Sequence, residues 1–244
     1  MSRETERLSR DLNKIRRLSS YLRHGETRPI RLVSTPVLAQ SLISEVICCW
    51  REFFPKALCE LSSHHTLEII QSLLLRESDI GLTFQPVVHS GLKTQVIGEG
   101  RIMVIAPPNW WTPEEMSSPI LLNELAGMPL IALENDDVLG SALRDQLSLL
   151  TPPPQINTWV QTYQLARSLV SAGQGLALVD PITALDNQYE RLQARPLEPV
   201  VPVQIYALCR IDKAHGPREH KLLELASKVA ISLLQMNTGN DDAV

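Results

Sequence analysis

The N-terminal part of the chain carries a narrow stripe of apolar residues. Spacings of three and four residues place side chains on one face of an α-helix. The pattern therefore predicts a helix over residues 3–24, inside a segment that ends at residue 26. A stripe this narrow suits pairing with another helix better than burial in a globular core, and a frayed surface helix is the alternative. The residues of the stripe, with Ser19 as one polar interruption, are Leu8, Leu12, Ile15 and Leu22.

From residue 30 onward, short apolar runs alternate with amphipathic stretches. Thr35-Pro36 marks the start of the first helix, because a hydroxyl residue followed by proline is a favoured helix beginning. The order strand, helix, strand, helix, strand is typical of a parallel sheet with helices on its faces. The predicted elements are residues 30–34, 35–54, 57–61, 67–75 and 79–84.

A second unit of the same kind follows. The chain leaves the first unit in a strand at 101–106 and returns in a long strand at 201–208, before a last helix at 217–234. Two passages between the units predict a hinge with a cleft. The strands predicted between them are 130–133, 157–160 and 176–179, and the helices are 140–149 and 162–172. We therefore predict an α/β protein with two Rossmann-like lobes joined by two crossover strands and preceded by a linker helix.

The predicted domain limits follow from these passages. The linker or dimerisation helix covers residues 1–26. The first lobe combines residues 27–101 with 206–235, and the second lobe covers 102–205. Residues 236–244 form a polar tail that we expect to be disordered.

Composition narrows the functional class. A hydrophobic content of 44% supports a buried core, and a net charge of -4 disfavours DNA binding by the chain as a whole. Residues 1–24 depart from this balance, with seven Lys/Arg against three Asp/Glu. No run of about 18 apolar residues and no signal peptide is present, so we expect a cytoplasmic protein without membrane contact. Four cysteines without a CxxC motif are expected to be reduced, namely Cys48, Cys49, Cys59 and Cys209.

Motifs for catalysis, nucleotides and metals are missing. The chain has no GxSxG, HExxH or GxxxxGK[ST] sequence. His64 and His65 lie near Cys59, but adjacent side chains on an extended segment point apart and no further zinc ligand follows at the usual spacing. We predict no metal, no cofactor and no enzymatic activity. A Ser/His/Asp arrangement formed only in space stays open.

The remaining candidates are polar groups where strands end and helices begin. Each one alone is explained by an ordinary helix cap or strand end. Together, on the same side of two sheets, they indicate a ligand site, because helix N-termini direct backbone amides at an anion. The first-lobe candidates are Ser34, Thr35, His65, Thr66, Thr83 and Phe84. The second-lobe candidates are Val138, Leu139 and Gly140 at one helix start, and Gln161-Thr162 at another.

Five motifs in order resemble the LysR-type transcriptional regulators over residues 7–235. Trp110 replaces a histidine of the family pattern, and residues 180–185 resemble the branch that senses amino acids and opines, including the regulator of diaminopimelate decarboxylation. The family's winged helix-turn-helix, which precedes the linker helix, is missing. The motifs are residues 32–36 (LVSTP), 73–82 (LLLRESDIGL), 102–110 (IMVIAPPNW), 122–133 (LNELAGMPLIAL) and 169–181 (LVSAGQGLALVDP).

This resemblance implies an effector-binding domain with a fold like that of periplasmic binding proteins. We expect a small carboxylate, such as an amino acid or opine, held by Thr35 and the amides of its helix. Asp180 either meets a ligand ammonium or simply starts a turn. The family implies a homodimer or tetramer that reaches DNA only through the missing winged helix-turn-helix. A stand-alone partner of full-length regulators, an enzyme using the same cleft and a transport-type binding protein are the alternatives, and the last lacks the expected export signal.

Overall fold

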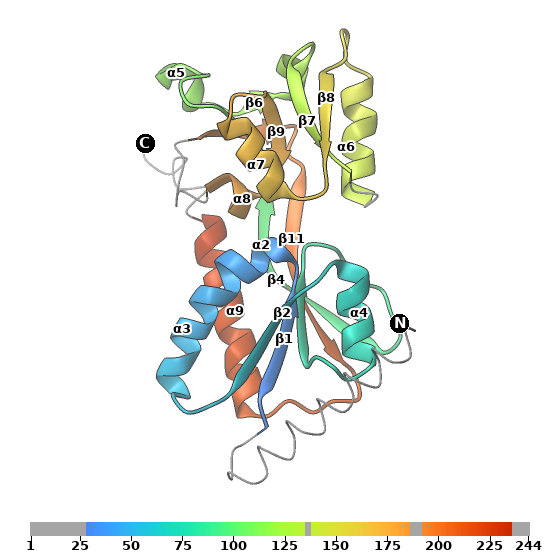
Figure 1. Ribbon diagram of the computed structural model, residues 1–244, viewed down its shortest axis with the longest axis vertical. Coiled ribbons are helices and arrows are strands. Elements are labelled where there is room, and N and C mark those ends of the chain that lie inside the picture. The colour runs from blue at the N-terminus through green and yellow to red at the C-terminus, as the bar shows by residue number, and fades with distance from the viewer. Residues whose placement is uncertain (1–27, 135–137, 186–191, 236–244) are drawn as a thin grey trace, which may run out of the picture.

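The computed structural model describes residues 28–134, 138–185 and 192–235. The predicted linker helix and the predicted tail lie outside these residues. Two α/β lobes lie end to end and are joined by two long strands, β4 (Leu92–Arg101) and β11 (Pro202–Arg210) (Figure 1). The predicted two-lobed α/β fold is therefore confirmed.

The first lobe is built on a five-stranded sheet with the order β2-β1-β3-β11-β4. Strand β1 pairs in parallel with β2 and β3, whereas β11 is antiparallel to β3 and β4. The three strands of the predicted parallel unit are therefore parallel, and the two strands that connect the lobes are added antiparallel to them or to each other. The new elements are β1 (Ile30–Ser34), β2 (Cys59–Ser63), β3 (Ile80–Thr83), α2 (Pro36–Leu38), η1 (Ala39–Ile43), α3 (Ser44–Phe53), α4 (Thr66–Leu74) and α9 (Pro217–Gln235).

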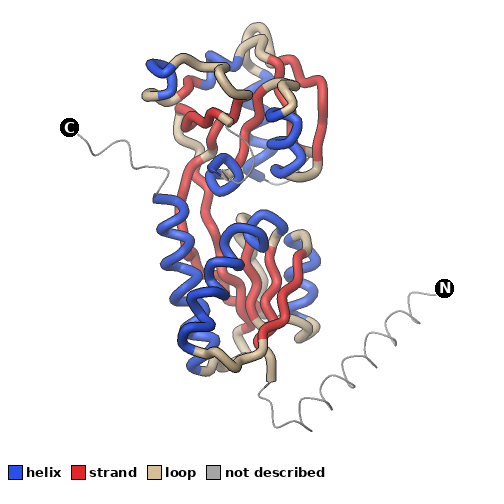
Figure 2. Tube along the Cα trace, turned by 60° about the vertical axis from the view of Figure 1, so that its left-hand side comes forward, coloured by secondary structure: helices blue, strands red, loops and turns tan. Residues whose placement is uncertain are grey.

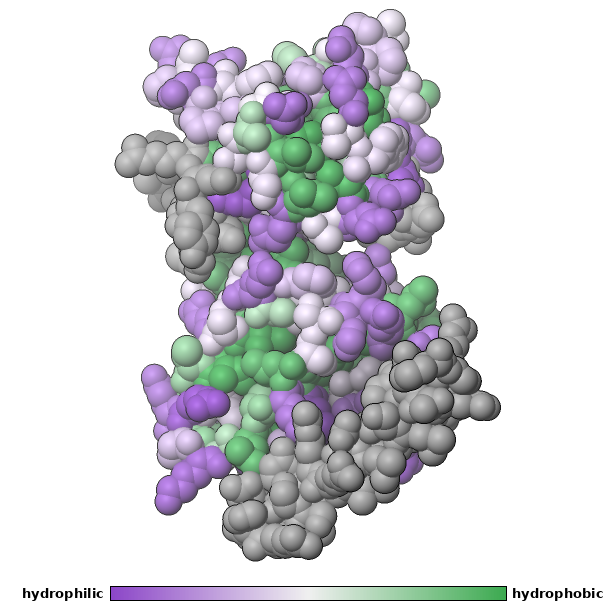
Figure 3. All heavy atoms as spheres, viewed as in Figure 1, coloured by the Kyte–Doolittle hydropathy of each residue, from purple (hydrophilic) through white to green (hydrophobic). Residues whose placement is uncertain are grey.

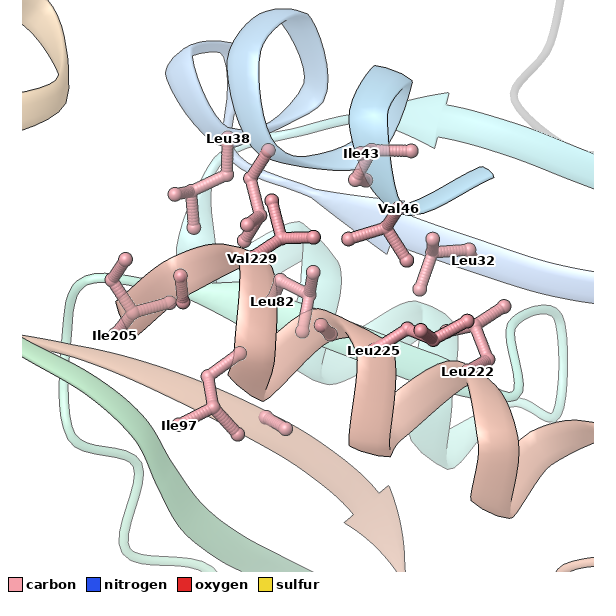
Figure 4. Packing of buried hydrophobic residues seen from close by; sticks show 14 of the residues in the cluster. Leu32, Leu38, Ile43, Val46, Leu82, Ile97, Ile205, Leu222, Leu225 and Val229 are labelled. Carbon is pink, nitrogen blue, oxygen red and sulfur yellow. The ribbon is translucent and has the colours of Figure 1, made fainter. Parts of the chain in front are cut away.

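The main core of this lobe lies between the sheet and the helices α3 and α9. Figure 4 shows Leu222, Leu225 and Val229 of α9 facing apolar side chains of the sheet and of the first helix. Helix α4 covers the opposite face of the sheet, where Ile69 and Leu73 are fully buried. Burial of such side chains on both faces is the dominant stabilising contribution to the lobe.

The helix after β1 contains one π-helical turn, η1, between α2 and α3. Leu38 and Leu42 are buried around this turn, and Ile43, Val46 and Ile47 continue the buried face. Such turns are frequent near functional sites.

The second lobe has a six-stranded sheet with the order β6-β10-β5-β9-β7-β8. Strand β6 was not predicted, because residues 109–124 were expected to form only loop and short helix. Strand β10 was not predicted either, because no element was assigned between the strands at 176–179 and 201–208. The strands are β5 (Met103–Ala106), β6 (Ile120–Leu121), β7 (Pro129–Leu133), β8 (Gln155–Val160), β9 (Leu176–Val179) and β10 (Gln193–Glu198). The helices are α5 (Pro113–Met116), η2 (Leu122–Leu125), α6 (Val138–Ser148), α7 (Tyr163–Ser171) and α8 (Pro181–Leu185).

The connection between the lobes is a two-stranded antiparallel ribbon. Strands β4 and β11 pair from Arg101 opposite Pro202 to Leu92 opposite Arg210, with a register shift between Ile205 and Tyr206. The tube view shows α9 running alongside this ribbon (Figure 2). The sequence predicted β11, the strand that returns to the first lobe, but not β4. Strand β4 leaves the first lobe and begins at Leu92, nine residues before the strand predicted at 101–106.

Gly100 permits close packing at this connection, and Gly100→Ala is expected to destabilise the protein. A Cβ atom at Gly100 meets Pro181 Cγ at 2.9 Å and Leu234 Cδ2 at 3.0 Å. Overpacking of this kind costs about 1–3 kcal/mol of unfolding free energy, measured by urea denaturation. Gly216→Ala is the matched control, because its Cβ meets only the Glu219 carboxylate oxygen, which can rotate away. Equal stability of the two variants would contradict the assignment of Gly100 as a packing constraint.

Candidate functional site

The turn between β1 and α2 lies at the end of the first lobe that faces the second lobe (Figure 1). Thr35 is the N-cap of the helix, with extended backbone angles, and its N–H donates to the Leu82 carbonyl at 3.2 Å. Ser34 is fully buried, and its hydroxyl donates to the Thr35 carbonyl at 3.1 Å. The turn is therefore fixed to β1 and β3 by its own hydrogen bonds.

The Thr35 hydroxyl, unlike the Thr35 N–H, makes no hydrogen bond to the residues that the structure describes. Its oxygen Oγ1 is buried, and it has no hydrogen-bond partner within residues 28–134, 138–185 and 192–235. A buried polar group without a partner costs about 1–3 kcal/mol, so proteins keep few of them. The helix that Thr35 begins has no acidic residue in its first turn. A hydroxyl and the free amides of a helix start therefore combine as donors for an anion.

At the second helix start of this lobe, that of α4, the positive end of the helix dipole already has a carboxylate beside it. The His65 N–H donates to Glu68 Oε2 at 3.2 Å, and His64 Nδ1 lies 3.6 Å from the same oxygen. A carboxylate at this place satisfies the helix N-terminus by itself. Of the two helix starts predicted as anion sites in the first lobe, the one at Thr35 has no acidic residue in its first turn, whereas the one at α4 has Glu68.

Thr66 and Thr83 form the polar contact beside this turn. Their hydroxyl oxygens lie 3.1 Å apart, and Thr83 Oγ1 also accepts from the Gln85 N–H at 3.1 Å. The parallel register brings the ends of β1, β2 and β3 to one edge of the sheet, which aligns these residues with Ser34. Phe84, directly after β3, packs against apolar clusters of both lobes.

The second-lobe residues are placed by α6 and α7. The backbone of Val138, Leu139 and Gly140 forms the first turn of α6, at the end of the lobe that faces the first lobe (Figure 1). The preceding residues 135–137 and the side chains of this turn lie outside the described part. At α7, the Thr162 hydroxyl accepts from the Leu165 N–H at 3.2 Å, which makes it an ordinary N-cap.

Asp180 forms its hydrogen bonds within the second lobe. Its carboxylate is buried, and its two oxygens accept the N–H and the hydroxyl of Thr183 at the start of α8. Burial raises the pKa of Asp180 above its usual range. This geometry corresponds to the turn-starting alternative for Asp180, so we build the site without it.

Contacts between the lobes were not visible in the sequence. Ile182 of α8 belongs to the apolar cluster of the first lobe, and Tyr163 packs against clusters of both lobes. The space-filling view shows the lobes meeting at a narrower waist (Figure 3). The Asp-Pro turn before α8 could have indicated a helix start, but nothing in the sequence places Ile182 against the other lobe.

Metal and nucleophile chemistry receive no support within the described residues. No group of three or more His, Cys, Asp or Glu residues there could hold a metal ion. Burial raises the pKa of the Cys59 and Cys209 thiols to about 11, so both stay protonated at neutral pH. Among the helices that the structure describes, none combines the length and apolar composition that a membrane crossing requires.

A family model described as the LysR substrate binding domain matches residues 23–230. The chain belongs to this family. The predicted resemblance to LysR-type regulators is thereby confirmed, and the family accounts for the two lobes and their double connection.

Relatives and solved structures agree with this membership. The HTH-type transcriptional regulator DgcR of Pseudoalteromonas sp is 23% identical over 205 residues, which cover 84% of this chain and 70% of that protein. AdmX of Serratia plymuthica, another HTH-type transcriptional regulator, is 22% identical over 89% of this chain and 68% of its own length.

Two solved structures show the same fold. The BenM effector binding domain with its effector benzoate has a TM-score of 0.71 at 22% identity, covering 84% of this chain and 92% of that one. HinK, a LysR family transcriptional regulator from Pseudomonas aeruginosa, has a TM-score of 0.71 at 14% identity, covering 95% of this chain and 82% of that one.

Proposed function

We propose that this LysR-type effector-binding domain senses a small carboxylate that binds between its lobes at Thr35. The observation that carries the proposal is the buried Thr35 hydroxyl without a partner among the described residues, at a helix start without an acidic residue. Ser34, Thr66, Thr83 and Phe84 form the wall beside it, with His65 at its exposed rim. The first turn of α6 completes the site from the second lobe.

The chemical class of the ligand follows from these donors. A hydroxyl and helix amides recognise an anion, and a partly buried helix N-terminus favours it by up to about 2 kcal/mol. Benzoate, the effector named for the BenM domain, is a carboxylate and supports the class. Within the carboxylates, amino acids and opines are the candidate effectors.

The ligand would act on transcription by changing the relative stability of two arrangements of the lobes. We place this step in the cytoplasm, in a homodimer or tetramer that contacts DNA through a winged helix-turn-helix outside this chain. Relatives named as transcriptional regulators support this role rather than catalysis.

Thr35→Val is expected to weaken ligand binding while keeping the shape of the turn. Loss of one hydrogen bond to a charged group costs about 1–3 kcal/mol, or roughly 5- to 150-fold in affinity. Calorimetry with benzoate, amino acids, opines and dicarboxylates measures this change. Thr94→Val is the matched control, because the Thr94 hydroxyl donates to the Val87 carbonyl at 2.6 Å inside the lobe.

The same substitution is expected to stabilise the ligand-free protein, by roughly 1 kcal/mol, because it removes a buried polar group without a partner. Thr94→Val should lower stability instead, since it breaks a hydrogen bond. A confirmed ligand that binds Thr35→Val with unchanged affinity would overturn the site. A preferred ligand without an anionic group would overturn the carboxylate class.

A further inference from the structure

Helix α8 follows β9 of the second lobe, but it also packs against the first lobe. Figure 1 shows α8 at the end of α9, and these two helices are in contact. Ile182 of α8 is 5% exposed and belongs to the apolar cluster of the first lobe, which also contains Ile97, Ile205 and Leu234. An apolar side chain of the second lobe is therefore buried in the core of the first.

Pro181, beside Ile182, packs on the ribbon that joins the lobes. A Cβ atom at Gly100 of β4 would lie 2.9 Å from Pro181 Cγ and 3.0 Å from Leu234 Cδ2. The glycine thus lets α8 and the end of α9 approach the ribbon closely. Through Pro181 and Ile182, the start of α8 contacts both the ribbon and the core of the first lobe.

The same short helix is held firmly by its own lobe. The two carboxylate oxygens of Asp180 accept the Thr183 N–H at 2.9 Å and the Thr183 hydroxyl at 2.5 Å. The Thr183 carbonyl accepts from Nη1 of Arg167, a buried residue of α7, at 3.1 Å. Ala184 lies in an apolar cluster of the second lobe. Because buried hydrogen bonds are costly to break, α8 is expected to move with the second lobe as one body.

We propose that α8 is a clamp that fixes the angle between the two lobes. Relative motion is the default for two units joined by a small interface, and a two-stranded ribbon gives little rigidity by itself. Rotation of one lobe against the other would draw Ile182 out of the first-lobe core and expose its apolar side chain to water. The clamp does not depend on the effector site proposed above.

The clamp shares its apolar cluster with the helix that Thr35 begins. Val37 and Leu38 of α2 belong to the same cluster as Ile182. Since packed cores transmit small shifts, a ligand that moves α2 changes the packing around Ile182. Occupancy of the site at Thr35 would then change the lobe angle through α8. This consequence, unlike the clamp itself, rests on the proposed function.

Residual dipolar couplings of the backbone amides, measured by NMR on the whole chain, test the clamp because they report the alignment of each lobe separately. In the wild type, the couplings of both lobes are expected to fit one common alignment tensor. Ile182→Ala should abolish this common tensor and weaken the alignment of one lobe, because the lobes then move relative to each other.

Ile105→Ala is the matched control. It removes the same atoms from a fully buried site, but Ile105 packs in the second-lobe cluster. The common tensor should persist in this variant. Gly100→Ala is a second variant of the clamp, since the added Cβ displaces Pro181 while Ile182 is retained. It should also abolish the common tensor, and it carries the test if Ile182→Ala does not fold.

Three results would contradict the clamp. A common tensor that persists in folded Ile182→Ala would show that the ribbon alone fixes the lobe angle. Separate tensors for the two lobes of the wild type would show that the angle is not fixed at all. Loss of the common tensor in Ile105→Ala would show that any cavity in the second lobe loosens the connection, so that α8 has no special role.

Discussion

Trp50→Ala is expected to lower the unfolding free energy of the first lobe by about 3–5 kcal/mol. Trp50 is fully buried between α3 and α9, and its ring centroid lies 5.4 Å from that of Phe54. Its Nε1–H donates to the Arg218 carbonyl at 3.0 Å. The substitution leaves a large cavity and a carbonyl without its donor, and both effects reduce stability.

Urea denaturation followed by circular dichroism measures this loss without depending on tryptophan fluorescence. Trp50→Phe separates the two contributions, because it keeps an aromatic ring but removes the donor. Trp110→Ala is the matched control, since Trp110 is 38% exposed in the second lobe. An effect of Trp50→Ala no larger than that of Trp110→Ala would contradict the packing described for the first lobe.

Asp79→Asn is expected to destabilise the protein by a comparable amount at neutral pH, about 3–5 kcal/mol, because it leaves buried cations without their anion. The Asp79 carboxylate accepts from Arg31 Nε at 3.2 Å and Nη2 at 3.0 Å, and Lys213 Nζ lies at 2.8 Å. The side chains of Arg31 and Lys213 are themselves mostly buried. Glu224→Gln is the control, because Glu224 and its partner Lys228 are both largely exposed, and exposed pairs contribute at most about 1 kcal/mol.

The pH dependence of this difference has a defined sign. Burial alone would raise the pKa of Asp79, but the hydrogen bonds from Arg31 and Lys213 outweigh it and hold the pKa well below its usual range. A carboxyl group with a lowered folded pKa stabilises the protein above its unfolded pKa of about 3.9 and loses this contribution as the pH falls further. The stability deficit of Asp79→Asn should therefore shrink below about pH 4. A deficit that is constant between pH 7 and pH 3, on the order of the neutral value, would contradict this role.

The elements with regular apolar spacing were predictable, and the irregular ones were not. Strand β1 and helix α4 were predicted within about two residues at each end, as is usual for such boundaries. Strand β4 was not predicted, and glycines such as Gly98 and Gly100 are unfavourable inside a strand. Their real role is to admit Leu234 and Pro181, which come from distant parts of the chain.

Some features of the candidate site could be predicted from the sequence, and others could not. Thr35 could be proposed from the sequence because a hydroxyl residue before proline begins a helix. The burial of its hydroxyl, and the hydrogen bond from its N–H to the Leu82 carbonyl across the sheet, could not be predicted from the sequence. Glu68 lies three residues after the N-cap His65, a spacing typical of a capping box, and this could have excluded α4 as an anion site. Asp180 was ambiguous in the sequence, and only the position of Thr183 shows what its oxygens bind.

A crystal structure of the chain with its preferred carboxylate tests the central claim most directly. The predicted result is a ligand between the lobes, with one carboxylate oxygen within hydrogen-bonding distance of Thr35 Oγ1 and of the amides at Val37 and Leu38. Pro36 has no N–H to offer, so these two amides are the first available donors of the helix. A ligand bound elsewhere, or bound between the lobes with the Thr35 hydroxyl still without a partner, would contradict the account.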